Sequence, residues 1–200
     1  MHDFNPKEIN DIVKTYKQEP ESCSEQAVFA FRAGGWCLQP FEQIKSALKA
    51  NDIWLDSTVF SQGHSDEPSR WFNFNTIPKQ AYWYFDNDPL KQQQDGYFTE
   101  LPISATKTSP LFFWKLALRK KLPSRLFMID GSKAGQLEKA FQEHLEQADQ
   151  DSIFNIMGHP KSLSPYSLIK LEQFLQLHSE LDSITYQDLK HLKKHRTFPR

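Results

Sequence analysis

The chain has 200 residues and a formal net charge of −1, from 24 basic and 25 acidic side chains. This length favours a single domain over residues 1–200 that buries its own core. The balanced charge provides no field that would attract nucleic acid or an anionic membrane, so we expect no nucleic-acid and no membrane partner. No apolar run approaches the ~20 residues of a membrane span. The first residues also show no basic and apolar leader, so we expect a cytoplasmic protein.

The first half of the chain alternates between helical patterns and short apolar runs. Asn5 followed by Pro6 is typical of a helix start. The polar residues 19–26 predict a loop after this helix, and a second helix is expected to start at Pro40. The strands predicted in this half cover residues 27–31, 53–59, 82–85 and 97–103, and residues 60–80 are expected to be irregular.

The second half continues the alternation. Leu137, Phe141 and Leu145 share one helical face, which predicts a helix over residues 136–147. The further elements predicted are helices at 110–120, from Ser164, and after a capping box of Thr185 and Asp188, and strands at 125–129, 152–157 and 181–184. Strands that alternate with helices predict an α/β fold with a largely parallel sheet.

Three polar residues follow or end predicted strands. Arg32 follows the strand at 27–31, Asp56 lies near the end of the next, and His159 follows the strand at 152–157. In parallel α/β folds, functional residues gather beyond the carboxyl ends of the strands. A cation, a carboxylate and an imidazole together can hold a base, tune an acid and protonate a leaving amine. For each residue the alternative is a structural role in a surface loop, as an ion pair or a cap.

Residues 31–36, which read FRAGGW, resemble the arginine motif of polysaccharide deacetylases of the NodB homology type, the carbohydrate esterase family four-like enzymes. Residues 52–59 are similar to the family's next strand, which carries a carboxylate. Residues 97–103 fit the subgroup that has this arginine motif. Residues 155–161 resemble the final histidine motif, and the resemblance spans roughly residues 5–190.

The resemblance implies an incomplete (β/α) barrel that hydrolyses N-acetyl or O-acetyl groups on a polysaccharide with a divalent, zinc-like metal. Arg32 would orient a catalytic aspartate, and Asp56 would tune the histidine. His159 would act as general acid. Trp36 and Trp83 would line the acetyl or sugar pocket. The implied partner is an acetylated glycan.

The family's base aspartate and metal ligands come from two motifs that precede the arginine motif. Only 31 residues precede Arg32 here, and they contain no HxxxH and no TFDD-like run. The chain therefore resembles the C-terminal part of such a domain. We expect it to lack the first strands of the barrel and the metal ligands, and to be inactive alone. An open sheet edge would also favour association, so a homodimer is a possible assembly.

The sequence is also compatible with other functions and sites. A catalytically dead module could bind glycans through its aromatic surface. Cys37 could act as a nucleophile after the glycine turn, or be a small buried hydrophobe; with Cys23 it forms no disulfide framework. His191 and His195 have the i, i+4 spacing of zinc-binding helices, but a solvated helix face explains the same spacing.

Overall fold

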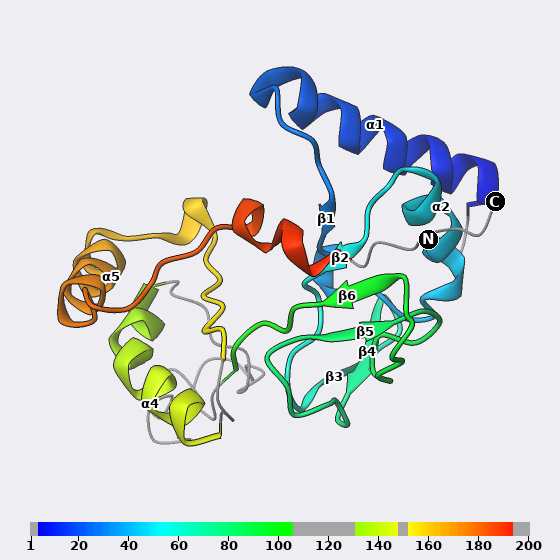
Figure 1. The fold of residues 1–200 in the computed structure, drawn as a ribbon. Coiled ribbons are helices and arrows are strands. Elements are labelled where there is room, and N and C mark those ends of the chain that lie inside the picture. Colours follow the sequence, from blue (N-terminus) through cyan, green and yellow to red (C-terminus); the bar gives the residue numbers. More distant parts are fainter. Residues whose placement is uncertain (1–3, 106–130, 148–151, 194–200) are drawn as a thin grey trace.

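The computed structural model of the protein describes residues 4–105, 131–147 and 152–193 (Figure 1). In chain order the elements are α1 (Pro6–Ser24), β1 (Ala30–Phe31), the 3-10 helix η1 (Gly34–Trp36), α2 (Glu42–Ala50), β2 (Leu55–Asp56), β3 (Gly63–Glu67), β4 (Arg70–Phe74), β5 (Trp83–Phe85), β6 (Phe98–Glu100), η3 (Gly131–Gln136), α4 (Leu137–Gln147), η4 (Pro160–Ser162), α5 (Pro165–Leu177) and η5 (Tyr186–Leu192).

A small mixed sheet organises the N-terminal half. Its strand order is β1-β2-β6-β5, in which β1, β2 and β6 run parallel and β5 is antiparallel to β6. The ladder continues beyond β2 and β6 through a parallel bridge between Phe60 and Ile103. Helices and a largely parallel sheet confirm the predicted α/β class.

Apolar side chains pack on both faces of this sheet. Helices α1 and α2 and the β3–β4 hairpin share one core with the inward aromatic residues of β5 and β6. On the other side, η5 places Leu189 and Leu192 against Phe29 and Trp54. The stacked rings of Phe29 and Trp54 have centroids 5.1 Å apart. The sheet is therefore covered by the two ends of the described chain.

Helix α1 is longer than the sequence predicts. Asn5 caps it as expected: its side chain accepts from Lys7 and Glu8 amides, and Glu8 accepts from the Asn5 amide. The predicted loop at 19–26 is wrong, because the helix continues through Pro20 to Ser24. Side-chain contacts also tie this helix to the rest of the chain. Lys17 Nζ donates to the carbonyls of Val28 and Asn51 at 3.1 and 2.8 Å.

The segment 60–80 is not irregular but contains the antiparallel β3–β4 hairpin. Along β4, Trp71 and Asn73 are exposed, and Phe72 and Phe74 are buried. This alternation is the period-two pattern of a half-buried strand. The hairpin pairs with no strand of the main sheet and forms a second, two-stranded sheet.

Two strands predicted in the C-terminal half do not form. Residues 152–157 are extended, with a single bridge at Met157, and bond to the chain after β6 through Ser104 and Asn155. Residues 181–184 have no strand partner. The predicted helix at 110–120 and strand at 125–129 lie outside the described residues. The capping box of Thr185 and Asp188 is confirmed, and it begins the 3-10 helix η5.

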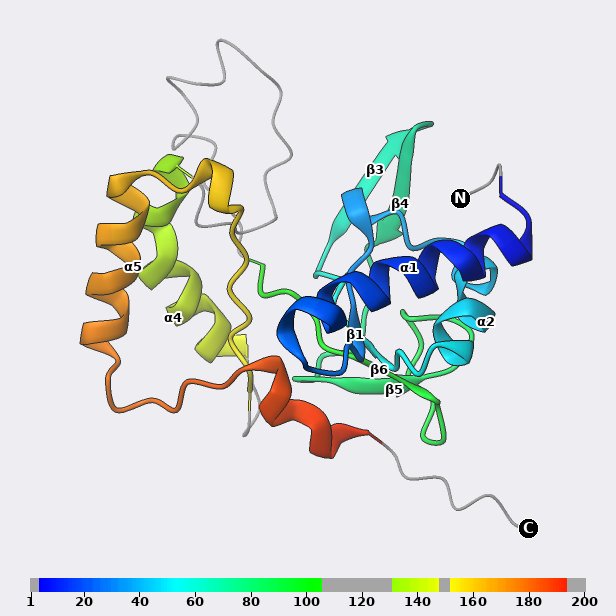
Figure 2. The same cartoon turned by 90° about the horizontal axis from the view of Figure 1, so that it is seen from above.

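Helices α4 and α5 form a separate cluster with η3. Phe141 and Phe174 meet edge to face at a centroid distance of 5.3 Å, with Phe154 against them. Figure 2 shows α4 and α5 side by side, away from α1 and α2. In the described segments no helix combines the length and apolar character needed to cross a membrane.

Gly96 provides a test of the packing between β5 and the turn before β6. A Cβ at this position would lie 2.3 Å from the Phe85 carbonyl oxygen, which is backbone and cannot move aside alone. We expect Gly96→Ala to lower the free energy of unfolding by about 1–3 kcal/mol, measured by urea denaturation. Gly34→Ala is the matched control, because nothing lies within 4 Å of its Cβ position. Equal denaturation midpoints for the two variants would contradict this packing.

Candidate functional site

The parallel strands end at one edge, and the register there brings chemistry-bearing side chains together. Phe31 pairs with Asp56, and Asp56 pairs with Glu100. Arg32 follows immediately after β1. In a parallel ladder, paired residues face the same side of the sheet, so Asp56 and Glu100 project together.

Arg32 is held by a network centred on Ser57. Its Nε donates to the Ser57 carbonyl at 2.7 Å and its Nη2 to Ser57 Oγ at 3.0 Å. The same Nη2 donates to the Tyr186 hydroxyl at 2.9 Å, and that hydroxyl bonds to Ser57 Oγ at 3.0 Å. Asn155 Nδ2 also donates to Ser57 Oγ, at 3.0 Å. A guanidinium fixed along two of its nitrogens is well oriented, since little side-chain entropy remains to be lost on binding.

Asp56 and Glu100 form a buried carboxyl pair. Their exposed fractions are 1% and 0%. Thr58 Oγ1 donates to Asp56 Oδ1 at 2.5 Å, and the Val59 amide donates to Glu100 Oε1 at 3.0 Å. No other residue of the described segments donates to Asp56 Oδ2 or Glu100 Oε2. The two carboxyl groups interact with each other, so protonation of the pair would lower the cost of burying them.

Burial controls the titration of this pair. Loss of solvent raises the pKa of Asp56 to about 6, although Thr58, Glu100, Ser57 and Arg32 all oppose the rise. Burial and the neighbouring Asp56 charge raise the pKa of Glu100 well above its ordinary value. Two carboxylates in one dry site cannot both ionise at low cost. Because the titrations are coupled, the proton belongs to the pair rather than to either residue.

A pocket of about 390 Å³ lies beside Arg32, and we call it the basic pocket. It is lined by Arg32, Ala33, Gly34, Gly35, Trp36, Arg70, Met157 and His159. The glycine turn shapes one wall: Gly35 and Trp36 both have left-handed backbones, with φ of 64° and 62°. Glycine suits position 35 because an L side chain rarely adopts this backbone conformation, and Arg70 Nε lies 3.6 Å from where its Cβ would be.

The basic pocket has a positive wall. Arg32 and Arg70 place two guanidinium groups on it. No Asp or Glu is among the lining residues. Trp36 is half-buried, and its ring packs edge to face against Phe60 at a centroid distance of 5.7 Å. The pocket therefore offers N–H donors, an aromatic edge and the apolar Met157.

The structure brings together three of the five residues proposed from the sequence. Arg32, Trp36 and His159 line the basic pocket. Asp56 lies in the core next to it and does not reach its surface. Trp83 lies elsewhere: it is 1% exposed, donates from Nε1 to the Pro89 carbonyl at 2.8 Å, and fills the core beneath the sheet. In this conformation it cannot contact a ligand.

Glu100 of the carboxyl pair and Arg70 of the basic pocket were not predicted from the sequence. Glu100 interrupts an apolar strand, and a charged residue inside such a strand is a signal for a buried polar role. Arg70 lies at the start of β4, in the segment predicted to be irregular. The alternation of residues 71–74 was the signal that would have placed it on a strand.

The structure does not support the Cys37 nucleophile or the zinc site of His191 and His195. Cys37 is exposed, and its Sγ donates to the Gly35 carbonyl at 3.6 Å. No histidine or carboxylate lines the pocket that Cys37 borders, so nothing there would activate the thiol. His191 is exposed with Nδ1 2.8 Å from the Asp188 carbonyl, and His195 lies outside the described residues.

The divalent metal implied by the sequence resemblance does not fit the residues present. Within residues 4–105, 131–147 and 152–193, no three His, Cys, Asp or Glu side chains gather as a metal ion requires. Asp56 and Glu100 supply only two carboxylates. They are sealed from solvent, whereas a metal site needs about three converging ligands.

Comparison of the chain with family models, curated proteins and solved structures finds no match in any of the three.

The carboxyl pair predicts a pH dependence of stability. Burial raises both pKa values in the folded state, so the folded state holds protons that the unfolded state has already released. The free energy of unfolding is therefore highest below the unfolded pKa values and falls as pH rises through the folded pKa values. For Asp56, whose pKa moves from 3.8 to about 6, the loss is roughly 3 kcal/mol between these pH values. We expect Glu100→Gln to flatten this decline, since an amide donates to Asp56 without needing a shared proton. The measurement is urea denaturation from pH 4 to pH 8.

Glu146→Gln on the exposed face of α4 is the control for this experiment. It removes one carboxylate without touching the pair, and we expect its curve to follow that of the wild type. Parallel pH curves for the wild type and Glu100→Gln would show that the pair does not share a proton.

Proposed function

We propose that the chain is the pocket-bearing part of an incomplete barrel of the polysaccharide deacetylase type and that it binds an acetylated glycan in the basic pocket. One observation carries the proposal. Arg32, Trp36 and His159 belong to two motifs separated by more than half of the chain, and they line one pocket. The groups of a binding site must lie near one another, so this convergence supports the proposal.

The lining of the pocket suits an acetyl group. The carbonyl oxygen of an acetyl group accepts hydrogen bonds, and its methyl group prefers apolar contact. Within the described segments, Nη1 of Arg32 makes no hydrogen bond, so its N–H groups remain as donors. Trp36 and Met157 provide apolar surface for the methyl group and for the adjoining sugar face.

The charge of the pocket predicts a preference between acetylated and deacetylated glycans. The amine of a free amino sugar is partly protonated at neutral pH, and two guanidinium groups would repel the ammonium form. An acetylated amino sugar is neutral and retains a carbonyl acceptor. Since no Asp or Glu lines the pocket, nothing there would favour the ammonium form. The pocket should therefore hold the acetylated form more tightly.

Binding and hydrolysis are separable in this proposal. A metal would supply hydroxide at neutral pH by lowering the pKa of bound water. The residues described here offer no ligand set for it, and no hydrolytic step is assigned to them. The second candidate function, a module that binds glycans without hydrolysing them, uses the same pocket.

The binding proposal can be tested by titration calorimetry with tetra-N-acetylchitotetraose. We expect saturable binding, and weaker binding of the fully deacetylated tetrasaccharide by about tenfold or more because of the repulsion above. Trp36→Ala should weaken binding of the acetylated sugar about tenfold through lost aromatic contact. Near-UV circular dichroism would confirm that the variant keeps its fold.

Tyr16→Ala is the matched control, because Tyr16 is an aromatic residue on α1 that is 72% exposed and lines neither pocket. It should bind as the wild type does. The proposal fails if the folded wild type binds neither tetrasaccharide, or if Trp36→Ala binds the acetylated one with unchanged affinity.

A second prediction concerns hydrolysis of the acetyl group. We expect the chain to release no acetate above background from acetylated chitooligosaccharides when Zn²⁺ is supplied, and to bind Zn²⁺ only weakly by calorimetry. Arginine cannot replace the metal, because it is a fixed cation that does not generate hydroxide. Zinc-dependent acetate release would reveal a ligand set beyond the residues described here.

A further inference from the structure

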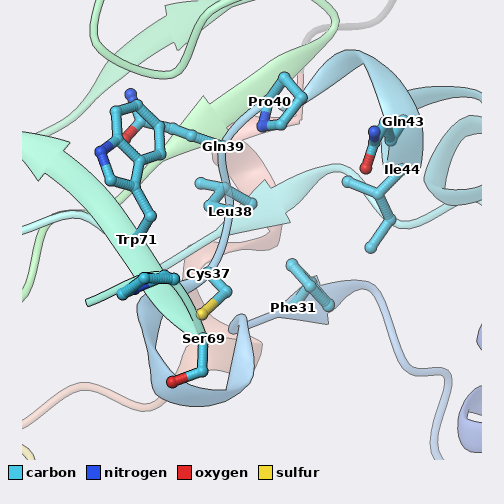
Figure 3. A pocket seen from close by; sticks show the side chains of 10 residues that line it. Phe31, Cys37, Leu38, Gln39, Pro40, Gln43, Ile44, Ser69 and Trp71 are labelled. Carbon is cyan, nitrogen blue, oxygen red and sulfur yellow. The ribbon is translucent and has the colours of Figure 1, made fainter. Parts of the chain in front are cut away.

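We infer that a second pocket of this chain, next to the basic pocket, is a subsite for a neutral sugar ring that stacks on Trp71. The inference extends the proposed function and rests on it. We call this the hairpin pocket; its volume is about 340 Å³, and its lining includes Phe31, Gln39, Gln43, Ile44, Ser69 and Trp71 (Figure 3).

The alternation of side chains along β4 explains why Trp71 is exposed. Its neighbours Phe72 and Phe74 face the core, so the pleat of β4 turns Trp71 outward, where it is 49% exposed. A half-exposed tryptophan contributes little to the core and leaves a large ring surface in water. In Figure 3 Trp71 and Ser69 lie on the hairpin side of the pocket, opposite Gln43 and Ile44 on the side of α2.

The polar groups of the hairpin pocket are neutral. Gln39, Gln43 and Ser69 supply amide and hydroxyl groups, and no charged side chain is among the lining residues. Gln39 is held in place because its Oε1 accepts the Asn73 amide at 2.7 Å. Its Nε2 makes no hydrogen bond within the described segments, which leaves a positioned donor for a ligand.

These features together select the chemistry of the ligand. A pyranose ring has an apolar face of C–H groups and an edge of hydroxyl groups. Trp71 matches the face, and the Nε2 donor of Gln39 matches the edge. The lack of charge distinguishes this pocket from its basic neighbour, so the ligand here is an uncharged sugar.

The two pockets are adjacent through β4. Arg70 lines the basic pocket and Trp71 lines the hairpin pocket. The two residues are consecutive, and successive side chains of a strand point to opposite sides. Cys37, which directly follows the η1 turn, also lines the hairpin pocket, whereas Gly34–Trp36 line the basic one. The two pockets therefore lie on opposite sides of β4, and an oligosaccharide that fills both must bend around the hairpin edge at the η1 turn.

Calorimetry with sugars of two lengths tests the subsite. We expect the wild type to bind tetra-N-acetylchitotetraose at least tenfold more tightly than di-N-acetylchitobiose. Trp71→Ala should remove most of that gain, with about a tenfold loss of tetrasaccharide affinity, and Trp71→Phe should keep most of it. Gln39→Glu retains the acceptor for the Asn73 amide but removes the donor, and should weaken tetrasaccharide binding severalfold. Tyr16→Ala is the exposed-aromatic control.

An indole nitrogen signal in the ¹H–¹⁵N NMR spectrum gives an independent readout. The signal missing from Trp71→Phe identifies Trp71, and it should shift on addition of the tetrasaccharide. If Trp71→Ala binds the tetrasaccharide as tightly as the wild type and the signal does not shift, the subsite is overturned while glycan binding in the basic pocket stands. If the folded wild type binds neither sugar, the proposed function itself fails.

Discussion

The buried contact between the carboxyl groups of Asp56 and Glu100 constrains the whole strand-end region. Removing two carboxyls from water is costly unless hydrogen bonds and a proton compensate. Thr58 Oγ1 supplies one bond to Asp56, and the same oxygen accepts the Ala33 amide at 2.9 Å. The Val59 amide supplies one to Glu100. The ends of β1, β2 and β6 are thereby tied together, and the glycine turn that forms the basic pocket begins from a fixed point.

Ser57 extends this order to the C-terminal half of the chain. Its hydroxyl meets Arg32, Tyr186 and Asn155, which lie 25, 129 and 98 residues away in sequence. Asn155 also bonds to the chain after β6 through its side chain and its amide. The segment that carries His159 is therefore anchored to the sheet although it forms no strand. This anchoring, rather than a complete barrel among the described residues, is what places His159 beside Arg32.

The β3–β4 hairpin divides the ligand surface by charge. One side of β4 carries Arg70 and contributes to a pocket with cations and no carboxylate. The opposite side carries Trp71 and contributes to a pocket with amides and no charge. The strand itself produces this separation, because its successive side chains face opposite ways.

The local sequence determined the helix caps, the α/β alternation, the four strands of the main sheet, and Arg32, Trp36 and His159 as candidate site residues. These depend on neighbouring residues: Asn5 and Thr185 cap helices through amides two or three positions away. The tertiary structure alone decided that Asp56 pairs with Glu100 and that Trp83 is enclosed in the core. It also decided that residues 152–157 gain no full strand pairing. Register and burial arise from contacts between segments distant in sequence, and a local pattern contains no information about which distant partner will occupy the opposite face.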